Sequence, residues 1–254
     1  MGTKIKNPEM MGKSGSNWNV VTGCNKYSDG CLNCFAEDVI NWLQNMGQKK
    51  YTNGFNLTCH YDRLDWPLKL AKKPKTPVRS FVTELGDLFH EKVPDEFIIK
   101  VFDVLIQVPQ HRFYFITKRA ERLGQLGPHL PWKPWMWAGV TVESEKYLSR
   151  IDELRKLPKE VNKFVMMEPL LSAMPKLNLD DIDWLIVGGE TNKKGKFREM
   201  KKDWVINLRD QAKTAGLPFM FKHWANKTHN SEPALLQGEM WNEIPSSLLK
   251  NINW

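Results

Sequence analysis

Short runs of buried-type residues alternate with segments of helical spacing from residue 78 onward. This alternation restricts the fold more than any other feature of the sequence. We expect strands at 78–84, 113–117, 135–142, 163–167, 184–187 and 217–221. Between them we expect helices at 94–108, 119–126, 144–157 and 202–215. Strands that alternate with helices at this spacing form βαβ units and a parallel sheet. The sequence therefore predicts an α/β fold, a partial to full (β/α) TIM-type barrel with parallel strands and outer helices.

Two more strands are expected nearer the N-terminus, at 17–22 and 55–60, which raises the count to seven or eight. The 254 residues suit one domain, since α/β barrels reach this size as single units. We divide the chain into a flexible N-terminal arm (1–16), the barrel (17–224) with an insertion (47–76), and a C-terminal cap (225–254).

Charge and cysteine content narrow the class of protein. No apolar run is long enough to span a bilayer, and the N-terminus lacks the apolar stretch of a secretory signal. Three of the four cysteines are clustered, unlike a disulfide framework, so we expect a reducing, cytoplasmic setting. The net charge of +8 is compatible with a nucleic-acid partner, although solvated lysine-rich faces would produce the same value.

Three cysteines, Cys24, Cys31 and Cys34, fall within eleven positions of the chain. They lie between the expected strand 17–22 and a segment of helical spacing, 35–46. Thiolates so close together can converge on one soft metal centre, either zinc or an iron–sulfur cluster. A closed structural zinc site needs four ligands. A [4Fe–4S] cluster held by three cysteines would instead leave one iron open to another ligand.

Polar residues and one pair of glycines follow the expected strands at the ends where barrel enzymes carry their chemistry. They are Glu84, Asp87, His90, Glu91, Thr117, Lys118, Thr141, Glu143, Glu168, Gly188, Gly189, Glu190, Lys222 and His223. Each alone is explained as a helix cap, a loop charge or a tight turn. Their repetition at successive strand ends predicts one shared site.

Other chemistries receive less support. The sequence contains no paired-histidine zinc motif, no Walker loop, no nucleophile elbow and no dinucleotide fingerprint. Two alternatives stay open. One is a non-catalytic nucleic-acid-binding protein with a zinc ion held by the three cysteines and Cys59 or His60. The other is a barrel hydrolase that uses carboxylates such as Glu84 and Glu168.

Three cysteines in the loop after the first strand of an α/β barrel resemble the radical SAM superfamily, as does the aromatic Phe35 after the third cysteine. The chain also resembles the phage Gp37/Gp68-like family (DUF5131). The matching segments are 18–24, 31–37, 86–91, 116–119, 139–143, 168–171, 187–190, 221–224 and 241–245. The order of motifs is similar to the spore photoproduct lyase branch, with Asp87 and Glu91 in one turn and Thr117 before Lys118.

The resemblance implies a [4Fe–4S] cluster on Cys24, Cys31 and Cys34 and S-adenosylmethionine on its open iron. Asp87 or Glu84 would accept hydrogen bonds from the methionine amine or the ribose. The residues expected to contact the cofactors are Phe35, Glu84, Asp87, Lys118, Thr141, Glu168, Gly188, Gly189 and Glu190. Those expected to take part in catalysis are Lys118, Glu143, Glu168 and His223.

The implied activity is formation of a 5′-deoxyadenosyl radical, with a nucleobase of DNA or a modified nucleotide as substrate. The specific reaction we expect is isomerisation of a hypermodified thymine in phage DNA, in the host cytoplasm. A flavodoxin- or ferredoxin-type protein would donate the electron. Two features depart from the superfamily pattern: six residues rather than three separate Cys24 from Cys31, and the glycine pair before Glu190 comes late in the chain.

Overall fold

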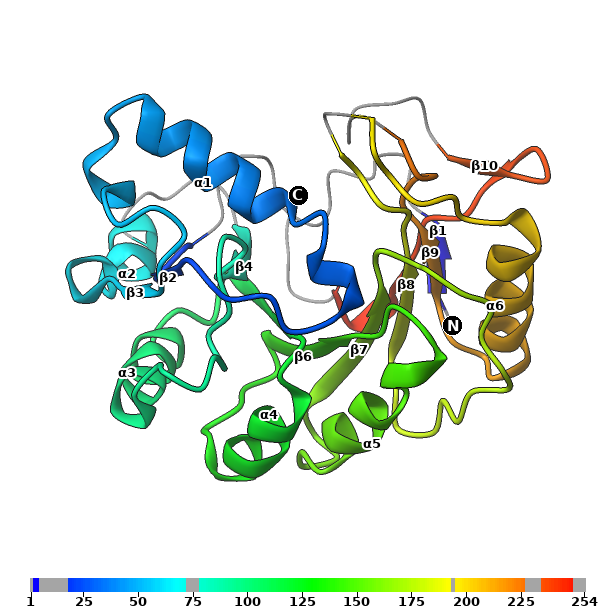
Figure 1. Ribbon diagram of the computed structural model, residues 1–254. Coiled ribbons are helices and arrows are strands. Elements are labelled where there is room, and N and C mark those ends of the chain that lie inside the picture. The colour runs from blue at the N-terminus through cyan, green and yellow to red at the C-terminus, as the bar shows by residue number, and fades with distance from the viewer. Residues whose placement is uncertain (1, 5–17, 72–77, 193–194, 227–233, 249–254) are drawn as a thin grey trace.

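The computed structural model describes residues 2–4, 18–71, 78–192, 195–226 and 234–248. Its centre is a six-stranded parallel sheet that curls into a half-barrel (Figure 1). The strands follow one another in chain order: β4 (Arg79–Val82), β5 (Arg112–Thr117), β6 (Met136–Thr141), β7 (Asn162–Met167), β8 (Trp184–Val187) and β9 (Phe219–Phe221). This confirms the α/β class and the partial form of the predicted TIM-type barrel.

Helices cover the outer side of the curled sheet (Figure 1). They are α3 (Asp95–Leu105), α4 (Ala120–Leu126), α5 (Ser149–Arg155) and α6 (Lys202–Thr214), close to the predicted bounds. In α3, Phe97, Val101 and Leu105 recur every fourth residue and are fully buried against the sheet. The apolar stripe of each helix thus explains why it packs on the outer face.

The count of seven or eight barrel strands was too high. The expected first strand is reduced to β2 (Val21–Thr22), which pairs antiparallel with β3 (Thr58–Cys59) in the insertion. Side chains replace much of the ladder between this segment and β4. Asn19 Oδ1 accepts from the backbone N–H groups of Glu84 and Leu85 at 2.8 and 2.9 Å. Isolated parallel bridges, such as Trp18 to Val82, still hold the segment beside the sheet edge.

The cysteine loop and the insertion consist of short elements: η2 (Asp29–Cys31), α1 (Phe35–Asn45), η3 (Lys49–Tyr51), η4 (Tyr61–Arg63) and α2 (Trp66–Ala71). Two further short helices lie in connections of the barrel, η5 (Gly127–His129) before β6 and η6 (Glu145–Tyr147) before α5. The predicted helix 35–46 is thereby confirmed as α1, and the predicted strand 55–60 is shortened to β3. Among the described helices, none has the length and apolarity that a membrane crossing requires.

The C-terminal segment contains β10 (Leu235–Leu236), β11 (Glu239–Met240), β12 (Glu243–Pro245) and η7 (Ser246–Leu248). β10 lies beside α6, whereas β12 and η7 fill the inner side of the sheet. Ile244 and Leu248 are fully buried among inward-facing aromatic side chains such as Tyr114, Trp137 and Trp184. Strand β12 also pairs with β1 (Gly2–Lys4), whereas the rest of the predicted N-terminal arm lies outside the described residues. The division into arm, barrel, insertion and cap stays a prediction.

Candidate functional site

The cysteine loop lies across the carboxyl ends of the strands, between β2 and α1 (Figure 1). Cys24 begins it, Cys31 ends the short helix η2, and Cys34 caps α1. All three thiols are partly exposed. A negative charge on Cys31 acts to raise the pKa of both Cys24 and Cys34, so the three sulfurs lie within electrostatic reach of one another.

The three thiols differ in how readily they ionise. Burial raises the pKa of Cys24 to about 11 against the opposing charge of Arg119. Burial likewise raises the pKa of Cys34. At Cys31 burial also acts upward, but the charge of Lys118 and hydrogen bonds with nearby backbone bring the net pKa below its ordinary value. Of the three thiols, Cys31 therefore forms the thiolate most readily, and the thiolate is the form that binds metals.

Asp87, after β4, is tied to the first part of the loop through Arg119. Its carboxylate accepts from Thr117 Oγ1 at 2.7 and 2.8 Å and from Arg119 Nη1 at 3.2 Å. The same Arg119 nitrogen lies 3.4 Å from Cys24 Sγ. Arg119 also donates to the Asn25 side chain and, at 2.8 Å, to Glu91. Asp87 therefore positions the arginine beside the first cysteine.

Glu143, after β6, holds the middle of the loop. It is fully buried, accepts a short hydrogen bond from Ser28 Oγ, and pairs with Arg150 Nη1 at 2.6 Å. A Cβ atom on Gly30 would come within 2.6 Å of this carboxylate, so the loop can approach Glu143 only with a glycine there. Lys118 Nζ lies 3.9 Å from Oε1 of Glu143, the oxygen that also accepts from Ser28.

Glu190, after β8, holds the end of the loop. Asn33 Nδ2 donates to it at 3.0 Å, and Arg198 donates to both of its oxygens. Burial acts to raise the pKa of Glu190, but the Arg198 hydrogen bonds outweigh it and keep the carboxyl ionised. Arg198 also donates to the backbone oxygen of Asp29 at 3.0 Å.

Strand-end carboxylates after β4, β6 and β8 thus hold successive parts of one loop. This arrangement explains the six-residue spacing between Cys24 and Cys31, because the longer segment reaches from the β4–β5 side of the barrel to β6. We predicted cofactor or catalytic roles for Asp87, Glu143 and Glu190. The structure shows all three bonded within the chain, and their cofactor roles stay predictions.

Glu168, after β7, belongs to a separate group on the same rim. It accepts from Lys222 Nζ at 2.6 Å, and His223 Nε2 lies 2.9 Å from its other oxygen. Burial opposes ionisation, yet Lys222 and His223 hold the pKa of Glu168 well below its usual range. A Cβ on Gly188 would meet this carboxyl group at 3.0 Å, whereas Gly189 packs against the Ala225 backbone. The glycine pair thus makes room for close packing of the chain itself.

Four other predicted residues also lie around the rim. Lys118 is partly exposed and acts electrostatically on Cys31 and Cys34. Phe35 is exposed in the first turn of α1, beside Cys34. Thr141 is buried, and its carbonyl accepts from Arg150 at 2.6 Å. Glu84 is half-buried at the edge nearest Asn19.

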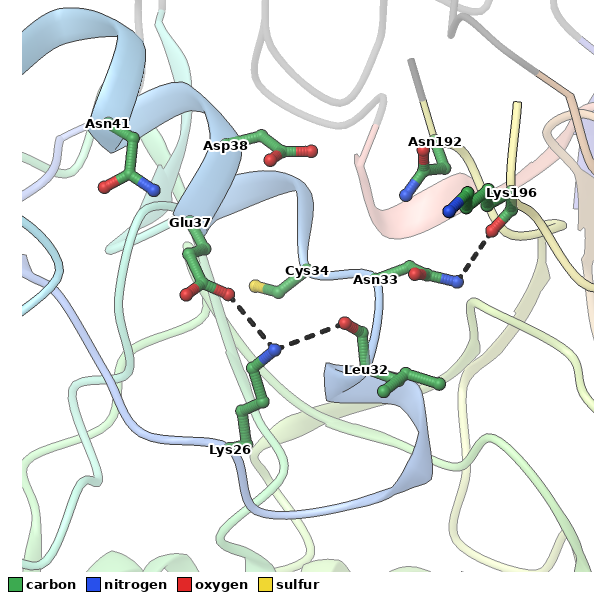
Figure 2. A pocket seen from close by; sticks show the side chains of 9 residues that line it. All are labelled: Lys26, Leu32, Asn33, Cys34, Glu37, Asp38, Asn41, Asn192 and Lys196. Carbon is green, nitrogen blue, oxygen red and sulfur yellow. Dashed lines mark hydrogen bonds and ion pairs between the residues drawn. The ribbon is translucent and has the colours of Figure 1, made fainter. Parts of the chain in front are cut away.

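A polar cavity of about 360 Å³ opens beside Cys34 (Figure 2). Lys26 Nζ links two residues of its lining, because it lies 3.3 Å from both the Leu32 carbonyl oxygen and the Glu37 carboxylate. The cavity lining consists of Lys26, Leu32, Asn33, Cys34, Glu37, Asp38, Asn41, Asn192 and Lys196. The cavity thus lies between the N-terminal turn of α1 and the loop that follows β8, two segments far apart in the sequence.

The donor set fits an iron–sulfur cluster better than a single metal ion. Among the described residues, no three Cys, His, Asp or Glu side chains are arranged around one ion. A zinc ion would draw its sulfurs to about 4 Å from one another, since Zn–S bonds are near 2.3 Å. His60 is engaged with Thr22 Oγ1 at 2.7 Å instead. A closed zinc site needs a fourth ligand beside the three thiols, whereas a cluster with one open iron needs only these three.

A family model described as "Protein of unknown function (DUF5131)" matches residues 11–245. The chain belongs to this family. That membership confirms the resemblance drawn from the motifs, and the family description assigns no activity. A comparison with curated proteins finds no match for this DUF5131 chain.

Solved structures of spore photoproduct lyase resemble this member of the family. A cysteine-to-serine mutant gives a TM-score of 0.50 at 13% identity, covering 68% of this chain and 55% of the lyase. A cysteine-to-alanine mutant with dinucleoside spore photoproduct gives 0.50 at 12% identity, with coverages of 82% and 64%. The chain therefore spans less than two thirds of these lyases. Identity this low shows a fold shared with these lyases and no more.

Sequence reasoning missed the basic partners at the rim. Arg119, Arg150 and Arg198 organise the loop, yet none was among the predicted site residues. Arg119 directly follows the Thr117–Lys118 pair, and that position was the available signal. Arg150 lies on α5 and Arg198 in the connection after β8, both far from the cysteines in sequence, so only the fold reveals that they are close.

Proposed function

We propose that this chain is a radical S-adenosylmethionine enzyme that acts on a nucleobase of DNA. The observation that carries the proposal is the three-cysteine loop, held by strand-end carboxylates across the mouth of a radical SAM-type half-barrel. Cys24, Cys31 and Cys34 would hold a [4Fe–4S] cluster. Bound there, such a cluster supplies the electron for reductive cleavage of S-adenosylmethionine, the source of a carbon radical.

The chain's own residues would bind and shield the reactants. Lys118 supplies a cation near Cys31 and Cys34 that suits the methionine carboxylate. Glu168 and His223 share a contact at Nε2 and can hold a proton at that atom. Beneath the mouth, buried aromatic residues such as Tyr114 and Trp137 exclude water from the barrel interior.

Two observations support DNA as the substrate. The net charge of +8 favours a phosphate-rich partner. The fold is shared with a lyase whose structure was solved with dinucleoside spore photoproduct. The specific reaction we propose is isomerisation of a hypermodified thymine in phage DNA, from a C–N to a C–C linkage, with a flavodoxin- or ferredoxin-type electron donor. Incubation with such DNA and digestion to nucleosides tests this step, and unchanged nucleosides would refute it.

Anaerobic reconstitution with iron and sulfide tests the cluster. We expect a brown wild-type protein with equal amounts of iron and sulfide. Cys31→Ala should lose most of the cluster because one of the three ligands is gone, whereas Cys59→Ala, a matched cysteine outside the loop, should keep it. A colourless protein with one zinc ion would instead support the non-catalytic nucleic-acid-binding alternative. Formation of 5′-deoxyadenosine under reduction then tests the radical step separately.

A further inference from the structure

Arg119 is a cationic side chain that donates a hydrogen bond to a cysteine of the loop. Its Nη1 donates to Cys24 Sγ at 3.4 Å and to Asp87 at 3.2 Å, while Nε donates to Glu91 at 2.8 Å. The side chain is almost fully buried. Its guanidinium carbon lies 4.9 Å from the centre of the Tyr27 ring. The planar donor fork is thus used on several sides at once.

The position of Arg119 does not depend on any bound ligand. Its backbone N–H donates to Thr117 Oγ1 at 2.9 Å, and that hydroxyl donates to the same Asp87 carboxylate that holds the guanidinium. Buried Asp87 also acts on Cys24 by its charge, in the direction opposite to that of Arg119. Cys24 therefore experiences two fixed, opposed charges on one side.

We propose that Arg119, fixed by Asp87, is a positioning residue that sets the reduction potential of the iron–sulfur centre held by Cys24, Cys31 and Cys34. The inference rests on the proposed function. Hydrogen bonds to ligand sulfur and nearby charge are the levers by which proteins tune such centres. The reduced form carries one more negative charge, so the Arg119 cation and its N–H···S bond stabilise that form and raise the potential.

Because Arg119 and Asp87 carry opposite charges, removal of each charge should shift the reduction potential in opposite directions. Arg119→Gln removes the cation and leaves two carboxylates, so the potential should fall. Asp87→Asn removes the anion and leaves Arg119 paired with Glu91, so the potential should rise. We expect each substitution to change the reduced-to-oxidised ratio at a fixed potential about tenfold, which is about 59 mV for a one-electron couple.

The measurement is a potentiometric titration followed by electron paramagnetic resonance on reconstituted wild-type and variant protein. Arg119→Lys keeps the charge and should recover much of the loss seen in Arg119→Gln. Arg155→Gln is the matched control, because Arg155 pairs with Asp152 and the Asp180 carbonyl rather than with the cysteine loop. Its potential should equal that of wild type.

The outcomes separate this inference from the proposed function. A wild-type chain that takes up no cluster overturns both. A cluster with unchanged potentials, or with shifts of the same sign in Arg119→Gln and Asp87→Asn, overturns the role of Arg119 alone. If those variants fail to fold, Glu91→Gln tests the same idea from the half-exposed end of the network. It should raise the potential by a smaller amount, and no rise overturns the inference.

Discussion

At the residue scale, folding changes the pKa of the buried histidine His60 near the edge of the sheet. His60 is buried beside β2, with Nε2 2.7 Å from Thr22 Oγ1. Burial, together with the charge of Lys50, lowers the pKa of His60 to about 4. Folding therefore favours the neutral ring, and the unfolded chain binds the proton more readily.

Acidification should consequently destabilise the protein before its carboxylates titrate. Between pH 6.5 and pH 4 the unfolded state holds more protons at His60 than the folded state, so stability falls as pH falls through this window. From pH 7 to pH 5 we expect a loss of about 1 to 2 kcal/mol from His60. Urea unfolding at both pH values measures it. His60→Asn should show a smaller difference, and an equal difference would contradict the assignment.

At the element scale, the cysteine loop (24–34) is hydrogen-bonded to the rim of the barrel at several points, and we call it the strap. Ser28 bonds to Glu143, the Asp29 amide donates to Tyr147 Oη at 3.1 Å, and Asn33 bonds to Glu190. The contacts come from two strand-to-helix connections, β6 to α5 and β8 to α6. Removal of one anchor should therefore loosen the strap without unfolding the sheet beneath it.

Gly30→Ala tests the middle anchor. The added methyl group would press on the Glu143 carboxylate, which is fully buried and cannot withdraw from Arg150 without cost. Overpacking of this kind destabilises by about 1 to 3 kcal/mol. We expect faster tryptic cleavage after Lys26, detected by mass spectrometry. Asn41→Ala, on the exposed side of α1, is the control. Cleavage at the wild-type rate in Gly30→Ala would show that the strap is not held there.

The same elements show how far the sequence could predict the structure. Period and spacing located all six sheet strands and their helices, because buried strands and amphipathic helices leave local patterns. The first strand was overestimated because Asn19 replaces backbone partners, an exchange that no local pattern reveals. For the site, strand-end polarity predicted which residues would gather. Their partners, such as Arg119 and Arg150, depended on how distant connections meet.

At the scale of the whole molecule, the half-barrel is closed on its inner side by the chain's own C-terminal segment. Trp184 Nε1 donates to the Glu243 carbonyl at 3.0 Å, and the Glu243 carboxylate accepts from the Phe219 amide at 3.2 Å. Ile244 and Leu248 then complete an apolar layer with Tyr114 and Trp137. A sheet of six strands leaves its concave face open, so this segment supplies packing that missing strands would otherwise provide.

Ile244→Ala tests whether this segment is part of the barrel core. The side chain is fully buried, so its truncation should cost about 2 to 5 kcal/mol. Leu235→Ala, at a side chain 52% exposed on β10, should change stability by less than about 0.5 kcal/mol. Tryptophan fluorescence and far-ultraviolet circular dichroism should report one coincident urea transition, because Trp137 and Trp184 contact the same layer as Ile244. An earlier, separate fluorescence transition would mean that the segment unfolds as an independent cap.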